Sequence, residues 1–70
     1  MPRHFDEQIQ GLLERLVLMG RVAESMIQLA LRVLIERNES LSKEVLRKEA
    51  EVNELQIEID DRAVKLTALQ

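Results

Sequence analysis

The 70-residue sequence has no cysteine, one histidine and one aromatic residue, Phe5. Without cysteine the chain forms no disulfide and has no thiolate metal ligand, which fits a reducing compartment. One histidine cannot build a histidine-based metal site alone, and one phenylalanine provides no platform for stacking bases. The basic residues are scattered among acidic ones at a net charge of −3. This pattern argues against a nucleic-acid-binding protein, which needs clustered basic charge.

The sequence also lacks a membrane span and a signal peptide. Five charged residues interrupt the most apolar segment, 12–35, whereas a span needs about 20 largely uncharged residues. The N-terminal stretch MPRHFDEQ has no apolar core of the kind that a signal peptide requires. We therefore predict a cytoplasmic protein.

Segment 12–35 predicts instead a long helix that must be covered from more than one side. Sixteen of its 24 residues are apolar and none is proline, whereas a surface helix normally has one apolar stripe and a wide polar face. The polar residues on and just before this segment project within a narrow arc. This polar stripe consists of Gln10, Glu14, Arg21, Gln28 and Arg32.

Three rows of apolar residues run along this first helix, which we predict to span about 4–37. The main row, called here the seam, alternates spacings of 4 and 3, as in helices packed at a shallow angle. Gly20, in the second row, indicates either the close approach of another helix or a tolerated surface glycine. The seam comprises Phe5, Ile9, Leu12, Leu16, Met19, Ala23, Met26, Ala30 and Val33. The second row, called here the outer ridge, comprises Leu13, Val17, Gly20, Ile27, Leu31 and Leu34, and a weaker third row comprises Leu18, Val22 and Leu29.

A short polar turn near 38–40 separates this helix from a second one, predicted over about 39–70. Asn38 can end the first helix and cap the second, and Ser40 is the alternative cap. Lys48 and Arg62 interrupt the second helix's own row, although their long stems can lie along it. That row comprises Leu41, Val45, Lys48, Val52, Leu55, Ile59, Arg62, Leu66 and Leu69.

The short connection predicts an all-α fold, an antiparallel hairpin of spectrin-like up-down helices that belongs to a larger bundle. A hairpin covers one side of the first helix and leaves its outer ridge bare, so a third helix or a second copy must complete the cover. We expect a coiled-coil-like homo-oligomer, such as a four-helix homodimer, and a second helix that continues past Gln70. The predicted core and interface residues are Leu12, Leu16, Met19, Ala23, Met26, Ala30, Val33, Val45, Val52, Leu55, Ile59 and Leu66.

No pattern in the sequence predicts catalysis or a bound cofactor. There is no glycine-rich phosphate loop, cysteine nucleophile or HExxH motif, and His4 beside Asp6 is best interpreted as an exposed terminal residue. Arginines inside long helices are typical of all-helical chorismate-mutase-like enzymes. Here, however, the three arginines of the first helix follow or flank its polar stripe, so we interpret them as facing solvent: Arg15, Arg21 and Arg32.

One polar row on the second helix is a weak metal-site candidate. Carboxylates at one-turn spacing, together with ligands from other helices, form the metal sites of helical bundles. Glu49 and Asp60 would be the ligands, but a solvated helix edge is the interpretation that we favour. The row comprises Glu49, Asn53, Gln56 and Asp60.

The order of several short motifs resembles PhoU, the family of bacterial phosphate-uptake regulators. Residues 4–34 are similar to the family's opening helix, and the second helix is similar to its acidic–x–x–Val/Ile–Asn–x–Leu pattern. The matching residues are His4-Phe5-Asp6, Met19-Gly20, Ala23-Glu24, the set Glu49, Val52, Asn53 and Leu55, and finally Ala68-Leu69-Gln70.

The resemblance implies a function that composition and spacing alone do not. PhoU proteins contain two three-helix bundles, so residues 1–70 would be a single partial PhoU domain, the first two helices of the first bundle. It implies a negative regulator in signal transduction, without enzymatic activity, that contacts the phosphate transporter's ATPase and a sensor histidine kinase. Iron or zinc binding in the family involves a third helix that this chain does not contain. The alternative is a helical dimerisation or scaffold module without a role in phosphate transport.

Overall fold

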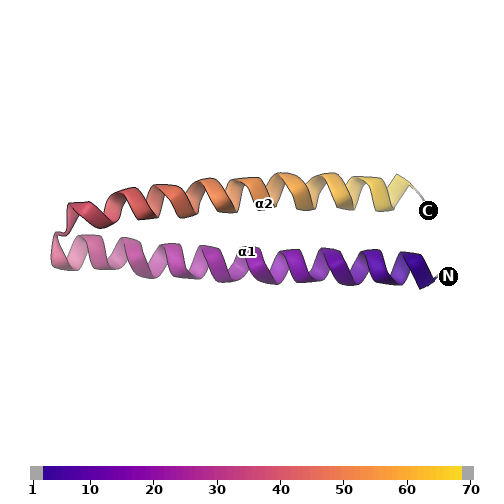
Figure 1. The fold of residues 1–70 in the computed structure, drawn as a ribbon, viewed down its shortest axis with the longest axis horizontal. Coiled ribbons are helices and arrows are strands. Elements are labelled where there is room, and N and C mark those ends of the chain that lie inside the picture. The colour runs from indigo at the N-terminus through magenta and orange to yellow at the C-terminus, as the bar shows by residue number, and fades with distance from the viewer. Residues whose placement is uncertain (1–2, 69–70) are drawn as a thin grey trace.

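The computed structural model describes residues 3–68, which form one long helical hairpin (Figure 1). Helix α1 spans Arg3–Glu36, a short 3-10 helix η1 spans Glu39–Leu41, and helix α2 spans Ser42–Ala68. The two long helices run antiparallel, so both termini lie at the same end (Figure 1). The hairpin measures 52 × 15 × 11 Å. The predicted all-α hairpin is confirmed. Leu69 and Gln70, which the sequence analysis places in the second helix, lie outside the described residues.

Local sequence explains why both long helices form. Asp6 lies in the first turn of α1, where negative charge offsets the helix dipole. Ion pairs one turn apart follow along the helices, with Arg32 Nε 3.1 Å from Glu36 Oε2 and Lys65 Nζ 2.9 Å from Asp61 Oδ2. These pairs are exposed, and such pairs contribute only a few tenths of a kcal/mol. Most of the stability must therefore come from packing between the helices.

The turn between the helices differs from the prediction in one respect. Arg37, not Asn38, adopts the left-handed conformation that ends α1, with φ of 53°. Asn38 has an extended backbone and caps η1, because its side-chain oxygen accepts a hydrogen bond from the Ser40 amide at 3.2 Å. The Ser40 hydroxyl also donates to this oxygen, so Ser40 supports the cap rather than replacing it. The expectation that Asn38 itself ends the first helix is therefore wrong.

The core of the hairpin is narrow and one-sided. Among the described residues only Leu55, Ile59 and Leu66 are buried, and all three belong to α2. Most seam residues of α1 are half-buried, but Ile9 and Leu16 remain 37% and 41% exposed at the seam's edge. From the third row, Val22 and Leu29 are half-buried beside the seam, so α1 turns slightly toward that row. Val45 and Val52 on α2, and Leu12, Met19, Ala23, Met26, Ala30 and Val33 on α1, are half-buried.

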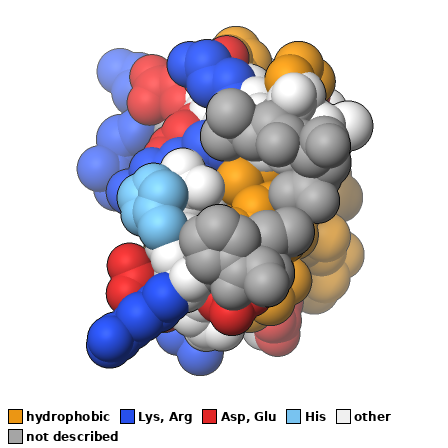
Figure 2. Space-filling model, turned by 90° about the vertical axis from the view of Figure 1, so that its right-hand side faces the viewer, with side chains coloured by type: hydrophobic (Ala, Val, Ile, Leu, Met, Phe, Trp, Pro, Cys, Tyr) orange, Lys and Arg blue, Asp and Glu red, His pale blue; other side chains and the backbone are white. Residues whose placement is uncertain are grey.

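The two sides of the hairpin have opposite character. Seen from the end that carries the termini, charged side chains gather on one side and hydrophobic side chains on the other (Figure 2). The large side chains of the outer ridge are 49–74% exposed: Leu13, Val17, Ile27, Leu31 and Leu34. The hairpin thus leaves the outer ridge bare, as the sequence predicts. No helix within residues 3–68 combines the length and apolarity needed to cross a membrane.

Candidate functional site

A cluster of three charged side chains bridges the two helices on the charged side. Glu58 of α2 forms salt bridges with both arginines, since its Oε2 lies 3.3 Å from Arg15 Nε and 2.7 Å from Arg62 Nη2. The cluster lies over Gly11, where an added Cβ would be 3.7 Å from Arg62 Nη1, an ordinary van der Waals contact. We call Arg15, Glu58 and Arg62 the charged cluster.

The position of Arg15 contradicts the interpretation, made from the sequence, that this side chain faces solvent. It does not face solvent as the polar stripe does, but is half-buried and reaches across to α2. Its spacing contained the signal, because Arg15 lies three residues after Leu12 and four before Met19, on the same face as both. Arg21 and Arg32 are exposed, and Arg32 pairs within its own helix. The three arginines therefore do not converge on one interior site.

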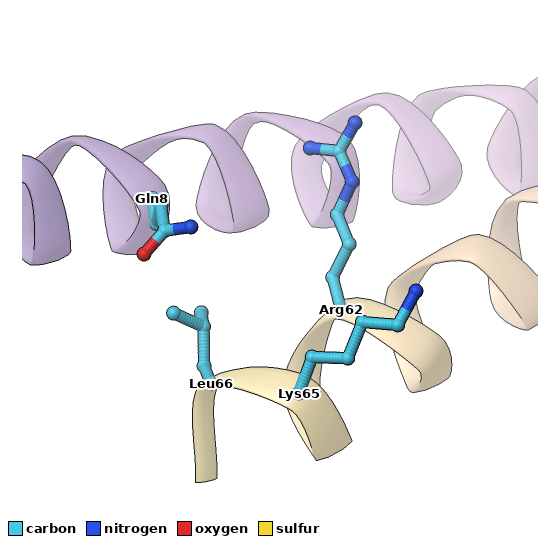
Figure 3. Close-up of a pocket in the computed structure, with 4 residues that line it drawn as sticks. All are labelled: Gln8, Arg62, Lys65 and Leu66. Carbon is cyan, nitrogen blue, oxygen red and sulfur yellow. The ribbon is translucent and has the colours of Figure 1, made fainter. Parts of the chain in front are cut away.

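Beside the charged cluster is a shallow pocket between the two helices (Figure 3). It is lined by Gln8 of α1 and by Arg62, Lys65 and Leu66 of α2. The Arg62 side chain rises from α2 toward α1, while Gln8 and Leu66 lie at the other end of the pocket (Figure 3). The Arg62 side chain is 45% exposed and the Lys65 side chain 73%. Each is paired with an acidic residue of α2, Arg62 with Glu58 and Lys65 with Asp61, and an acidic surface of a partner protein could approach their exposed cationic groups.

The weak metal candidates are not brought together with other potential ligands within the described residues. Glu49, Asn53, Gln56 and Asp60 are all exposed along α2, and so is His4 on α1. Residues 3–68 contain no group of three or more histidine, cysteine, aspartate or glutamate side chains placed to hold a metal ion. Glu49 and Asp60 could act as ligands only together with groups from another helix.

One exposed ion pair at the start of α2 alters the acidity of its members. Arg47 Nε donates to Glu44 Oε2 at 3.0 Å, and its Nη2 donates to the other carboxylate oxygen. The hydrogen bond from Arg47 lowers the pKa of Glu44, with a smaller Coulombic contribution from the same residue. The pKa of Arg47 is raised for the reciprocal reason. Glu44 also places negative charge in the first turn of α2, where it is favourable.

The apolar side has two grooves between the helices, one near each end of the hairpin. The groove near the turn is lined by Ala30, Val33, Leu34, Ser42, Val45 and Leu46. The groove near the termini is lined by Phe5, Ile9, Leu12, Ala63, Leu66 and Thr67. At 100° per residue, Ile9 and Leu34 lie on the same side of α1 as the outer ridge. The grooves and the ridge therefore form one long apolar surface, which suits another amphipathic helix better than a small molecule.

Two long antiparallel helices, a narrow shared core and a bare apolar side define a helical hairpin of the bundle-forming class. Within that class the chain belongs to the PhoU domain family, whose model matches residues 16–70. The predicted resemblance is thus confirmed. The motifs at Met19-Gly20, Ala23-Glu24 and 49–55 lie inside the matched range, whereas His4-Phe5-Asp6 precedes it.

One curated relative is similar along nearly the whole chain. A Thermotoga maritima protein described as "Phosphate-specific transport system accessory protein PhoU homolog 2" is 30% identical over 69 residues. The alignment covers 99% of this chain but only 29% of that protein, so the chain spans less than a third of its relative's length. No solved structure matches the chain.

Proposed function

We propose that this chain functions in the regulation of phosphate transport, as an accessory protein that acts through protein–protein contacts. The observation that carries the proposal is its membership of the PhoU domain family over residues 16–70. The description of the Thermotoga maritima relative as a phosphate-transport accessory protein supports it. The polar side chains of the hairpin are exposed and do not meet in one site, which favours a protein-binding function over catalysis.

The proposed partners are the ATPase of the phosphate transporter and a sensor histidine kinase, both reached from the cytoplasm. By binding them the protein would restrain the phosphate-starvation response. The charged side is the surface proposed for these contacts, because the apolar side is better suited to packing against helices. The charged cluster holds Arg15 and Arg62 in place through Glu58, and Lys65 stands beside them. Preordered long side chains lose less conformational entropy when a partner binds.

Lys65→Glu tests this proposal, with Lys43→Glu as the matched control. Lys65 borders the pocket near the termini, whereas Lys43 is an exposed lysine near the turn, 22 residues away along the chain. The length of α2 separates them by about 33 Å at 1.5 Å per residue. We expect Lys65→Glu to weaken binding to an immobilised transporter ATPase or kinase at least tenfold. Lys43→Glu should change binding by less than about twofold, because rim charges far from a contact contribute little.

Binding is measured with purified full-length chain by surface plasmon resonance at two salt concentrations. Equal weakening by both substitutions would contradict a contact centred on the charged cluster. If the unmodified chain binds neither the ATPase nor the kinase, the regulatory proposal fails. A helical dimerisation or scaffold module without a phosphate role would then be the better description.

A further inference from the structure

Helix α2 carries exposed apolar side chains on the side that faces away from α1. Leu46, Ile57 and Val64 are 64%, 69% and 68% exposed. At 100° per residue, Ile57 lies about 160° around the helix from buried Ile59, and the three exposed side chains fall within about 20° of one another. We call these three residues the distal row. Leu46 also borders the groove near the turn, and from there the row extends along about 27 Å of α2.

The charged residues that border the distal row are mostly acidic. Residues three or four positions away share a helix surface with each member of the row. At these positions the sequence places four carboxylates and a single basic residue, Lys43 at the end near the turn. Asp61 pairs with Lys65 at 2.9 Å, but no ion pair within residues 3–68 includes the other three carboxylates. The carboxylates are Glu49 and Asp60 on one side of the row and Glu54 and Asp61 on the other.

The charge balance of this part of α2 differs from that of the rest of the chain. Residues 49–65 contain six acidic and two basic residues, a net charge of −4, whereas the whole chain has a net charge of −3. An anionic lipid surface or a nucleic acid would therefore be repelled by the distal row. A second copy placed against the row would bring carboxylates of like charge together, which opposes association. The surface fits a partner with positive charge.

We propose that the distal row binds a basic amphipathic helix of a different protein, with an apolar stripe bordered by lysine or arginine. Helices recognise one another through anchors one or two turns apart, and Ile57 and Val64 are seven residues apart on one line. Basic side chains along the two edges of the partner helix would meet Asp60 on one side and Glu54 on the other. Opposite charges along both edges fix the register of the two helices and speed their encounter.

The proposed contact is small and separate from the regulatory contact proposed above. Three large apolar side chains provide only a modest area, which is typical of transient complexes. The distal row faces away from α1, whereas the charged cluster bridges α1 and α2. The pocket beside that cluster presents cationic groups and suits an acidic partner, so the two surfaces select partners of opposite charge. Either contact can therefore fail in an experiment without the other.

A pair of designed peptides tests the charge and the shape of the partner. The first is a fluorescein-labelled helical peptide of 21 residues, with leucine at the first and fourth positions of each heptad and lysine beside them. The second has glutamate in place of every lysine. By fluorescence anisotropy with the full chain at about 0.15 M salt, we expect the lysine peptide to bind with a Kd of about 10–100 µM. The glutamate peptide should bind at least tenfold more weakly, because it meets like charge.

Equal binding of the two peptides would overturn the proposal, because it would place them on the bare apolar side of α1. No binding of the lysine peptide at about 100 µM chain would overturn it as well.

Two matched pairs of variants locate the bound lysine peptide. Ile57→Ser and Ile27→Ser remove isoleucines that are 69% and 58% exposed, the first on the distal row and the second on the outer ridge. Asp60→Asn and Glu24→Gln each remove one exposed negative charge from the same two surfaces. We expect Ile57→Ser to weaken binding at least fivefold and Asp60→Asn about threefold, with less than twofold change for each control. A loss from either control as large as from its counterpart would overturn the proposal.

Discussion

Alanine substitution of one buried and one exposed isoleucine should distinguish the core of the hairpin from its surface. Ile59 and Ile57 are two residues apart on α2, yet Ile59 is 7% exposed and Ile57 is 69% exposed. Substitution by alanine deletes the same atoms from the same helix in both cases. Because the change in helix propensity is also the same, the difference between the two variants reports burial alone.

The expected size of the effect follows from this burial. Ile→Ala removes three carbon atoms, and each buried methylene contributes about 0.8 kcal/mol, so loss of transfer free energy alone amounts to roughly 2 kcal/mol at Ile59. A cavity would increase this toward the upper part of the 2–5 kcal/mol range, but neighbours in so open a core can collapse into the space. We therefore expect Ile59→Ala to destabilise the fold by about 2–3 kcal/mol. The whole chain of 70 residues should have a stability of only about 4–10 kcal/mol.

Urea unfolding followed by circular dichroism at 222 nm measures both variants. All samples need the same protein concentration, because association makes the unfolding midpoint concentration-dependent. Ile57→Ala should lie within about 0.5 kcal/mol of the unmodified chain. The interpretation of the core is refuted if Ile59→Ala loses less than about 0.5 kcal/mol. A greater loss from Ile57→Ala would refute it equally.

Two further predictions concern the turn and the start of α2. Arg37→Gly should raise the free energy of unfolding by about 1 kcal/mol, since glycine adopts a φ of 53° without the strain of a side chain. Arg37→Ala is the control. An equal gain in stability from Arg37→Ala would show that relief of backbone strain is not the cause. Titration of Glu44 by NMR should have a midpoint below the ordinary value of 4.5, and Arg47→Gln should move it back. Because the pKa is lowered in the folded chain, this pair stabilises the fold above about pH 4.5, and its contribution disappears as the pH falls through the lowered pKa. A midpoint unmoved by Arg47→Gln would show that another group sets the pKa.

The sequence was sufficient to predict the hairpin, because two long segments with a helical apolar period flank one short polar segment. It was not sufficient for the rotation of α1 about its axis. Several neighbouring rows on this helix are apolar, so spacing alone cannot distinguish a seam that includes Leu16 from one that turns toward Val22. Contact with α2 decides between them, and the sequence pattern of one helix does not contain that contact.

The charged cluster was not predicted for a related reason. A long arginine side chain can lie on the packing face and still carry its guanidinium to the edge. A classification of residues as apolar or polar therefore assigns Arg15 to solvent. The residue that ends α1 was not predicted, because asparagine is favoured both for ending a helix and for capping the next one. Asn38 has an extended backbone and caps η1, so Arg37 adopts the left-handed conformation that ends α1.

The off-centre core has a consequence for motion. Leu55, Ile59 and Leu66 all lie in the part of α2 that runs from its middle to the end carrying the termini. The half that contains the turn is held by half-buried contacts around an open groove. Regions with few buried contacts open at a lower free energy than the rest of a protein. The two helices should therefore separate first near the turn. The charged cluster, which lies nearer the end that carries the termini, should keep its geometry while they do so.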